Sequence, residues 1–170
     1  PALKRKVLEQ ASGLARDEAT RRRIDDDIRR LELLGKTPDL AFATAQGGKF
    51  SLSEQRGRIV ILVFWAGWSP PSVAWLAEFA GAARKLPAGR VAIATVSLDR
   101  SKANAEKTLE ALGIAGWPTA CDGGGWDSPL ARQLGINALP TVFVFDQNGR
   151  LRALNARADW QGVLRQLLAK

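Results

Sequence analysis

Two hydroxyl side chains, those of Ser69 and Ser72, enclose a pair of prolines directly after an apolar stretch. That stretch, residues 59–64, is rich in β-branched residues and is typical of a strand buried on both faces. Ser69 is a favourable N-cap, and Pro70 suits the first helical position because its missing N–H would have no partner there. The segment therefore predicts a strand, a tight turn at Gly67 and a helix, with both hydroxyls exposed at the positive end of the helix dipole.

The residue types that are absent limit the chemistry. The chain has no histidine and one cysteine, Cys121. Without histidine, Ser-His-Asp catalysis, Cys-His catalysis and histidine-containing zinc sites are excluded. A single cysteine also excludes an internal disulfide and a cysteine metal cluster, so we expect neither a metal nor another cofactor. Two interpretations of Cys121 stay open: a small, half-buried apolar residue, or a thiol with a redox or intermolecular-disulfide role.

The formal net charge of the chain is +8, and the basic residues are spread along it rather than clustered. Such a charge permits contact with nucleic acid or an anionic surface, but no recognition motif accompanies it, and we expect no nucleic-acid partner. No apolar run approaches the roughly 20 residues that span a bilayer. The chain begins with proline and lacks an apolar signal region, so we expect a mature form or a fragment without its targeting segment.

Residues 1–36 are predicted to form a helical extension or linker. Apolar residues lie at helical spacing on one stripe, with an interruption expected at Gly13 and a terminating glycine, Gly35, after the last turn. Three interpretations stay open for this segment. It packs on its own domain, it links that domain to another one, or it binds a partner.

Residues 37–170 alternate between strands and helices and are predicted to form one domain. The helix that begins within the serine motif is expected to have Ser69 as its N-cap and Pro70 as its first residue, and a later helix is expected to be capped by Ser101 or Asp99. Strand, helix and strand at this spacing form a βαβ unit, which requires a parallel pair and a right-handed crossover. The predicted segments are a hairpin at 40–43 and 50–52, then 59–64, 70–85, 91–98, 101–112, 117–122, 128–134, 141–145, 150–155 and 159–169.

The segment Phe64-Trp65-Ala66-Gly67-Trp68 before Ser-Pro-Pro-Ser resembles the active-site segment of the thioredoxin superfamily. It is similar to the TlpA/ResA-like branch, whose pattern is Phe-Trp-Ala-x-Trp-Cys-Pro-Pro-Cys. A second match, Leu139-Pro140-Thr141, resembles the cis-proline that precedes a strand in this family. The resemblance covers residues 37–170. It implies an α/β thioredoxin fold, in which helices flank a central mixed sheet, with an N-terminal β-hairpin and the helical extension.

By this resemblance, Ser69 and Ser72 occupy the positions of the two catalytic cysteines. The bond before Pro140 is then cis, and Leu139 and Pro140 lie against Ser69 and Trp68. The alternative is an ordinary trans proline that opens an edge strand. The loop would present backbone groups to an extended peptide, in a groove whose expected binding residues are Trp68, Pro70, Pro71, Leu139 and Pro140.

Thiol-disulfide exchange needs a thiolate and a second thiol that resolves the mixed disulfide. Serine cannot replace them, because an alcohol ionises many pKa units above a thiol, at about 1.4 kcal/mol per unit, and a helix end supplies at most about 2 kcal/mol. The sequence departs from the family at three further positions. Val63 stands where Asp or Asn is usual, Trp75 where the branch has Glu, and Ala77 where a proline often follows.

Two hypotheses follow from these departures. In the first, a natural protein has lost the redox role and keeps the fold as a module that binds a protein or peptide partner. In the second, an active thiol-disulfide oxidoreductase has been changed from Cys to Ser at positions 69 and 72. The family works outside the cytoplasm, so we expect an extracytoplasmic protein whose membrane contact is limited to an anchor upstream of Pro1.

Overall fold

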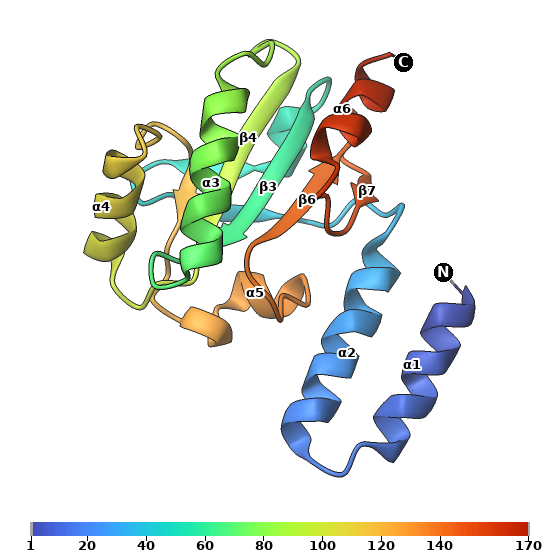
Figure 1. The fold of residues 1–170 in the computed structure, drawn as a ribbon. Helices are drawn as coiled ribbons and strands as arrows, with labels where there is room; N and C mark the ends of the chain where they lie inside the picture. The colour runs from blue at the N-terminus through green and yellow to red at the C-terminus, as the bar shows by residue number, and fades with distance from the viewer. Residues whose placement is uncertain (1, 170) are drawn as a thin grey trace.

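Strand β3 (Ile59–Trp65) lies in the middle of a five-stranded sheet with the order β5-β4-β3-β6-β7. The computed structural model of the protein describes residues 2–169, and Figure 1 shows the sheet with a two-helix extension beside it. All seven residues of β3 are buried, as its apolar run predicts. The other strands are β1 (Ala41–Ala43), β2 (Lys49–Ser51), β4 (Val91–Ser97), β5 (Thr119–Ala120), β6 (Thr141–Phe145) and β7 (Leu151–Ala153).

Helices cover the sheet and form the extension. They are α1 (Ala2–Leu14), α2 (Glu18–Leu33), α3 (Pro70–Ala83), α4 (Lys102–Ala111), α5 (Pro129–Gln133) and α6 (Trp160–Leu168). Two short 3-10 turns lie at Leu52–Gln55 and Gly125–Asp127. Among residues 2–169, no helix combines the length and the apolar character that a membrane crossing requires.

The connections of the sheet agree with those expected from the sequence. β3 pairs with β4 in parallel, and α3 connects the two strands, so the predicted βαβ unit is confirmed. β6 pairs with both β3 and β7 in the antiparallel sense, which confirms the predicted strand hairpin at the end of the chain. β1 and β2 form a separate two-stranded sheet, the expected N-terminal hairpin.

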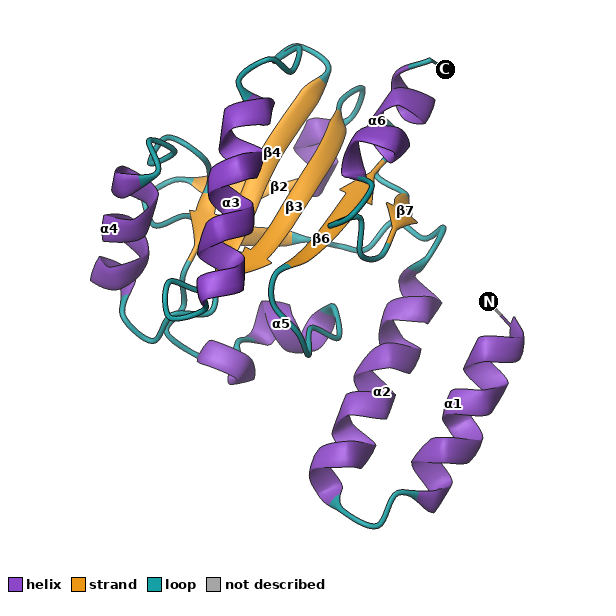
Figure 2. Ribbon diagram, in the orientation of Figure 1, coloured by secondary structure: helices purple, strands orange, loops and turns teal. Residues whose placement is uncertain are grey.

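Two hydrophobic clusters fill the spaces on the two faces of the sheet. Successive side chains of a strand point to opposite faces, so β3 contributes to both clusters. On one face, Ile61 and Val63 pack with residues of α3, α4 and α6. On the other, Leu62 and Phe64 pack with residues of the β1–β2 hairpin and α5. Figure 2 shows α3 in front of the sheet and β2 behind it.

The extension consists of two helices rather than one helix interrupted at Gly13. The prediction of a break at Gly13 is wrong, because Gly13 lies inside α1 and the chain leaves the helical conformation only after Leu14. The second helix begins where a better cap is available, since the Asp17 carboxylate accepts a hydrogen bond from the Thr20 N–H at 2.8 Å. Gly35 has a φ of +79° just beyond α2, as predicted for a terminating glycine.

Helix α2 packs on the domain that follows it in the chain. The Asn137 side-chain amide donates to the Arg23 carbonyl oxygen at 3.1 Å. Gly135, with a φ of +64°, lies so close to α2 that a Cβ atom there would overlap the Asp26 carbonyl oxygen. Helix α2 therefore packs on the same domain, and the interpretations of the extension as a linker or as a partner-binding segment stay predictions. Three large apolar side chains of α1 remain exposed, namely Leu3, Val7 and Leu14.

Candidate functional site

The serine motif lies where β3 turns into α3. β3 ends at Trp65, the chain turns through Gly67 and Trp68, and α3 begins at Pro70 with Ser69 at the N-cap position. The Ser69 carbonyl oxygen accepts hydrogen bonds from the Ser72 N–H at 2.9 Å and the Val73 N–H at 3.1 Å. The predicted order of strand, turn and helix is therefore confirmed.

The two serine side chains bond to each other rather than to the end of the helix. The Ser72 hydroxyl donates to the Ser69 Oγ at 3.0 Å. The Ser69 side chain makes no capping hydrogen bond to the helix backbone, although its residue occupies the N-cap position. The two hydroxyls therefore form one small polar pair at the start of α3.

The prediction that both hydroxyls are exposed is wrong. Ser69 is 8% exposed and Ser72 is fully buried. The reason is the phase of α3, since Ser72 begins the side of the helix that continues through the buried residues Leu76 and Phe79 toward the sheet. The residues between and before the serines are more accessible, because Pro70 and Pro71 are exposed. The site therefore presents proline and tryptophan surface rather than hydroxyl groups.

A buried carboxylate holds the turn in place. Asp99 is 3% exposed, and its Oδ2 accepts hydrogen bonds from the Gly67 N–H at 2.8 Å and from the Ser97 hydroxyl at 2.7 Å. Gly67 has no room for a side chain, because a Cβ there would lie 2.9 Å from the Thr108 Oγ1. Asp99 thus fixes the backbone just before Trp68.

Asp99 was one of two candidates for the cap of α4, and the structure assigns that role to the other. The Ser101 Oγ accepts a hydrogen bond from the Asn104 N–H at 3.4 Å. Asp99 lies two residues beyond the end of β4, the parallel neighbour of β3, and the carboxyl ends of parallel strands lie at the same edge of a sheet. That position was the signal in the sequence that could have placed Asp99 at this site.

The Leu139–Pro140 segment enters the sheet at the same end of β3. The peptide bond between these residues is cis, and Pro140 is buried. Thr141, the next residue, pairs with Phe64 near the end of β3 from which the serine turn departs. Leu139 is partly buried and packs against the cluster on the hairpin side of the sheet. The contact of Leu139 and Pro140 with Ser69 and Trp68 stays a prediction.

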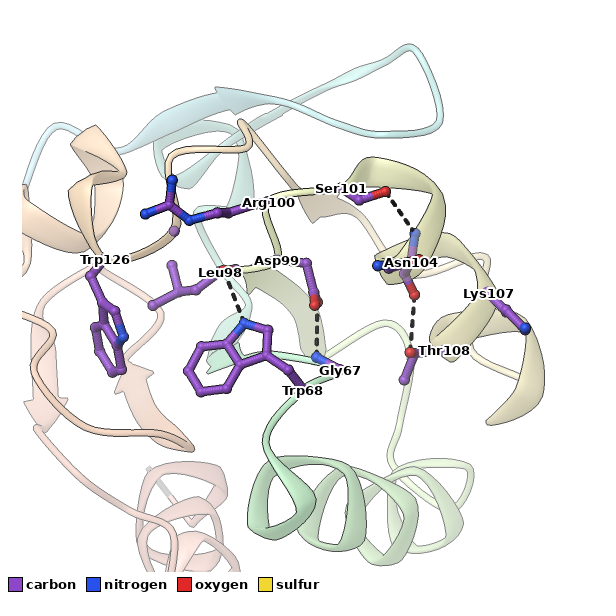
Figure 3. A pocket seen from close by; sticks show the side chains of 11 residues that line it. Gly67, Trp68, Leu98, Asp99, Arg100, Ser101, Asn104, Lys107, Thr108 and Trp126 are labelled. Atoms are coloured by element: carbon purple, nitrogen blue, oxygen red, sulfur yellow. Dashed lines mark hydrogen bonds between the residues drawn. The ribbon is translucent and has the colours of Figure 1, made fainter.

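A cavity of about 570 Å³ opens beside the turn and has Trp68 in its wall. Trp68 is 54% exposed, and its indole N–H donates to the Leu98 carbonyl oxygen at 3.5 Å. The Trp126 ring lies next to it, with 6.1 Å between the ring centroids and 59° between the planes. Figure 3 shows the cavity between these rings and helix α4. Its lining residues are Gly67, Trp68, Leu98, Asp99, Arg100, Ser101, Asn104, Lys107, Thr108, Gly125 and Trp126.

Sequence reasoning missed part of this wall. Trp126 belongs to no sequence motif, although it is 39% exposed and faces Trp68. Arg100 and Lys107 also line the cavity, and no pattern in the sequence distinguishes them from other surface cations. The exposed position expected for Trp68 itself, beside the turn, agrees with the structure.

Cys121 lies near the turn without belonging to the serine pair. Its thiol is half-buried and donates to the Asp99 carbonyl oxygen at 3.5 Å. Burial raises the pKa of the Cys121 thiol, which lowers the thiolate fraction at neutral pH. Among residues 2–169, no cluster of His, Cys, Asp or Glu side chains could hold a metal ion.

Two of the positions that differ from the family pattern have packing roles, since Val63 lies in the hydrophobic core and the partly buried Trp75 packs against it. Val63 is fully buried in β3, between Thr95 of β4 and Val142 of β6. The Trp75 ring stacks on Phe79 with 4.9 Å between the centroids. Its indole N–H donates to the Arg157 carbonyl oxygen at 3.0 Å. Both residues therefore have packing roles that a carboxylate could not fill.

Comparison with known proteins gives consistent results. A profile of the AhpC/TSA family matches residues 34–154. The thiol-disulfide oxidoreductase ResA of Geobacillus thermodenitrificans is 28% identical over 120 residues, which are 69% of this chain and 65% of the relative, just under two thirds of its length.

Solved structures show the same architecture. A thiol-disulfide oxidoreductase from Bacteroides fragilis superposes with a TM-score of 0.63 at 27% identity, covering 77% of this chain and 98% of the other. A C-terminal domain from Bacteroides thetaiotaomicron has a TM-score of 0.68 at 23% identity, covering 80% of this chain and 96% of the other. These matches establish the thioredoxin fold that the sequence motifs predict.

Proposed function

Because this chain belongs to the AhpC/TSA family, as a TlpA/ResA-like member of the thioredoxin superfamily, we propose that it binds a protein or peptide partner without thiol-disulfide exchange. The observation that carries the proposal is the hydrogen bond between Ser72 and Ser69, which stand where the family has its cysteines. Exchange requires an attacking thiolate and a resolving thiol. Cys121 is the only thiol of the chain, and it is half-buried with a raised pKa.

The surface around Trp68 supports a binding role. Trp68 is 54% exposed and lines a cavity, and Pro70 and Pro71, which follow it in the chain, are exposed as well. Exposed tryptophan is strongly enriched among the residues that dominate binding energy in protein interfaces. In this proposal, an extended segment of the partner lies across Trp68 and the prolines and reaches the Leu139–Pro140 loop.

A second candidate is a thiol-disulfide oxidoreductase in which both cysteines were replaced by engineering. The intact frame around the motif, from Phe64 to Trp68, favours it. Val63 and Trp75 favour the first candidate, because engineering of the cysteines alone would leave the usual acidic residues in place. A gene that encodes Cys at positions 69 and 72 would establish the second candidate. For either one we propose an extracytoplasmic location, from the resemblance to ResA.

The proposal is tested by selection of binding peptides together with an enzyme assay. The chain is immobilised and presented with a phage library of random dodecapeptides, and the Kd of the enriched peptides is measured by fluorescence anisotropy. We expect Trp68→Ala to weaken these peptides by about tenfold or more, since a buried tryptophan anchor is worth about 2 kcal/mol. Leu14→Ala is the matched control. It also removes an exposed apolar side chain, one that lies on α1, and should leave the Kd unchanged.

The enzyme assay is the reduction of insulin disulfides with dithiothreitol as electron donor. The chain is expected to add nothing to the rate of dithiothreitol alone. Catalysed reduction by the unaltered chain would overturn the redox-inactive part of the proposal. Absence of any peptide enriched over a blank surface would overturn the binding part.

A further inference from the structure

The cavity beside Trp68 combines an aromatic side with a polar, basic side. Figure 3 shows Trp68 and Trp126 on one side and Asn104, Lys107 and Thr108 of α4 on the other. The two indole rings are tilted by 59° with centroids 6.1 Å apart, so they form an angled apolar surface. Such a surface suits an aliphatic or aromatic side chain.

The two cations that line the cavity, Arg100 and Lys107, have no anionic partner in the part of the chain that the structure describes. Arg100 and Lys107 are exposed, and among residues 2–169 neither side chain forms an ion pair or a hydrogen bond. Asp99 is the one acidic residue in the lining, and its carboxylate is buried and engaged with Gly67 and Ser97. Glu106, on the same helix, is paired with Lys102 at 3.7 Å. The cavity therefore carries two positive charges that are available to a ligand.

The rest of the lining adds hydrogen-bonding groups that also favour a negatively charged ligand. The cavity includes the first turn of α4, where the backbone N–H groups and the helix dipole favour negative charge. Asn104 is exposed on this turn and can donate from its side-chain amide. These groups reinforce the two cations, so the basic side of the cavity selects carboxylates.

We infer that the cavity selects acidic peptide segments, with an apolar side chain against Trp68 and Trp126 and carboxylates at Arg100 and Lys107. The inference rests on the proposed peptide-binding function and names the class of peptide. Arginine pairs with carboxylates through two parallel hydrogen bonds, which adds geometric selectivity to the charge. Neighbouring side chains of an extended peptide point to opposite sides. A peptide in which acidic and apolar residues alternate therefore presents one kind to each side of the cavity.

The test compares two labelled peptides that differ only in charge. They are acetyl-Gly-Ser-Leu-Glu-Phe-Glu-Leu-Gly-Ser-amide and the same peptide with both Glu replaced by Gln, with Kd measured by fluorescence anisotropy at low salt. We expect the Glu peptide to bind about tenfold more tightly, since its two carboxylates form charge-assisted hydrogen bonds with Arg100 and Lys107 that the Gln peptide cannot form. The preference should decline as salt is added, because salt screens exposed charges.

Variants of the chain test which residues cause the preference for the Glu peptide. For Arg100→Gln/Lys107→Gln the Kd values of the two peptides should agree within about twofold, because the cations that pair with the Glu carboxylates have been removed. Lys85→Gln/Arg150→Gln is the matched control. It removes one lysine and one arginine that are exposed and outside the cavity, and the tenfold preference should remain. In Arg100→Glu/Lys107→Glu the order of the peptides should reverse, which distinguishes lost recognition from misfolding.

The outcomes separate this inference from the proposed function. Equal binding of both peptides, or display peptides without enrichment of Asp and Glu, would overturn the inference and leave peptide binding intact. A preference that disappears equally in Lys85→Gln/Arg150→Gln would also overturn it, because net charge rather than the cavity would then be responsible. Failure of the random library to yield any binding peptide would instead overturn the proposed function.

Discussion

The Ser72 hydroxyl donates a hydrogen bond to the Ser69 Oγ at 3.0 Å within the first turn of α3. Ser72 is fully buried and Ser69 nearly so, and the pair satisfies part of its hydrogen-bonding capacity internally. The two positions therefore still bring their side-chain tips together, as a dithiol motif requires. Positions 69, 72 and 63 carry Ser, Ser and Val, where the resemblance to the family implies two cysteines and an Asp or Asn.

Restoring the cysteines is expected to restore the disulfide but little of the activity. Ser69→Cys/Ser72→Cys should oxidise to an intramolecular disulfide, because the Oγ atoms already lie 3.0 Å apart. Insulin reduction should stay at least about tenfold below that of Geobacillus thermodenitrificans ResA, because Val63 supplies no group for proton transfer, a contribution typically worth 100-fold or more. Thiol titration and the insulin assay measure the two effects.

The control for this variant also carries Cys121→Ser, so that the remaining thiol cannot take part. The two restored proteins should behave alike, since Cys121 is half-buried against the Asp99 carbonyl. Insulin reduction as fast as that of ResA would show that Val63 and Trp75 are compatible with catalysis. That result would favour replacement of the cysteines by engineering.

Asp99 is expected to be essential for the geometry of the turn. Asp99→Ala leaves the Gly67 N–H and the Ser97 hydroxyl without their acceptor in a buried setting. The free energy of unfolding should fall by about 2–4 kcal/mol, as for other losses of hydrogen bonds to a buried charged group. Urea titration measures this loss, and peptide binding at Trp68 should weaken in parallel.

Asp99→Asn is the informative companion of that variant. Both hydrogen bonds end on the same oxygen, Oδ2, and the single amide oxygen of asparagine can occupy that position. The Asn variant should therefore recover more than half of the stability lost in the Ala variant. Equal losses in the two variants would indicate that the negative charge, rather than the acceptor, holds the turn.

The contact between α2 and the loop after α5 should be sensitive to a single methyl group. Gly135→Ala places a Cβ against the Asp26 carbonyl oxygen and forces a positive φ on alanine. We expect the free energy of unfolding to fall by about 2–3 kcal/mol, since the backbone strain alone costs roughly 1–2 kcal/mol. Gly116→Ala is the control, because nothing lies within 4 Å of its added Cβ, and it should change stability by less than about 0.5 kcal/mol.

The thiol of Cys121 should react slowly at neutral pH. Burial raises its pKa, and the thiolate is the reactive form, so the folded protein should be alkylated by iodoacetamide more slowly than the chain in concentrated urea. The rate should keep rising above the pH at which an ordinary thiol is half ionised. Because the folded state holds this proton more tightly, Cys121 also lowers the free energy of unfolding as pH rises through that range. Equal alkylation rates in the two states would contradict the burial of the thiol.

Strands and helices could be predicted because their signals are local. The apolar run of β3, the proline after Ser69 and the turn glycines all act within a few residues. The break in the extension was misplaced because glycine in a helix costs only about 1 kcal/mol, and the cap at Asp17 decided the position instead.

The candidate site was predicted less completely, because it depends on contacts between distant segments. The motif placed Trp68 correctly, but the burial of Ser69 and Ser72 depends on how α3 rotates against the sheet. Trp126 approaches Trp68 from the loop before α5, far away in sequence. Its role is visible only once the strands have brought the two loops together.

Trp126 belongs to a second cavity as well as to the one beside Trp68. That cavity, of about 500 Å³, has its other walls in α2, including Arg22 and Arg23. The helical extension and the cavity beside Trp68 therefore meet at a single ring, that of Trp126. If a ligand of the proposed site repositioned Trp126, linkage would require a partner bound to α2 to change the affinity for that ligand by the same factor. Through its contact with this ring, the extension is part of the surroundings of the proposed site.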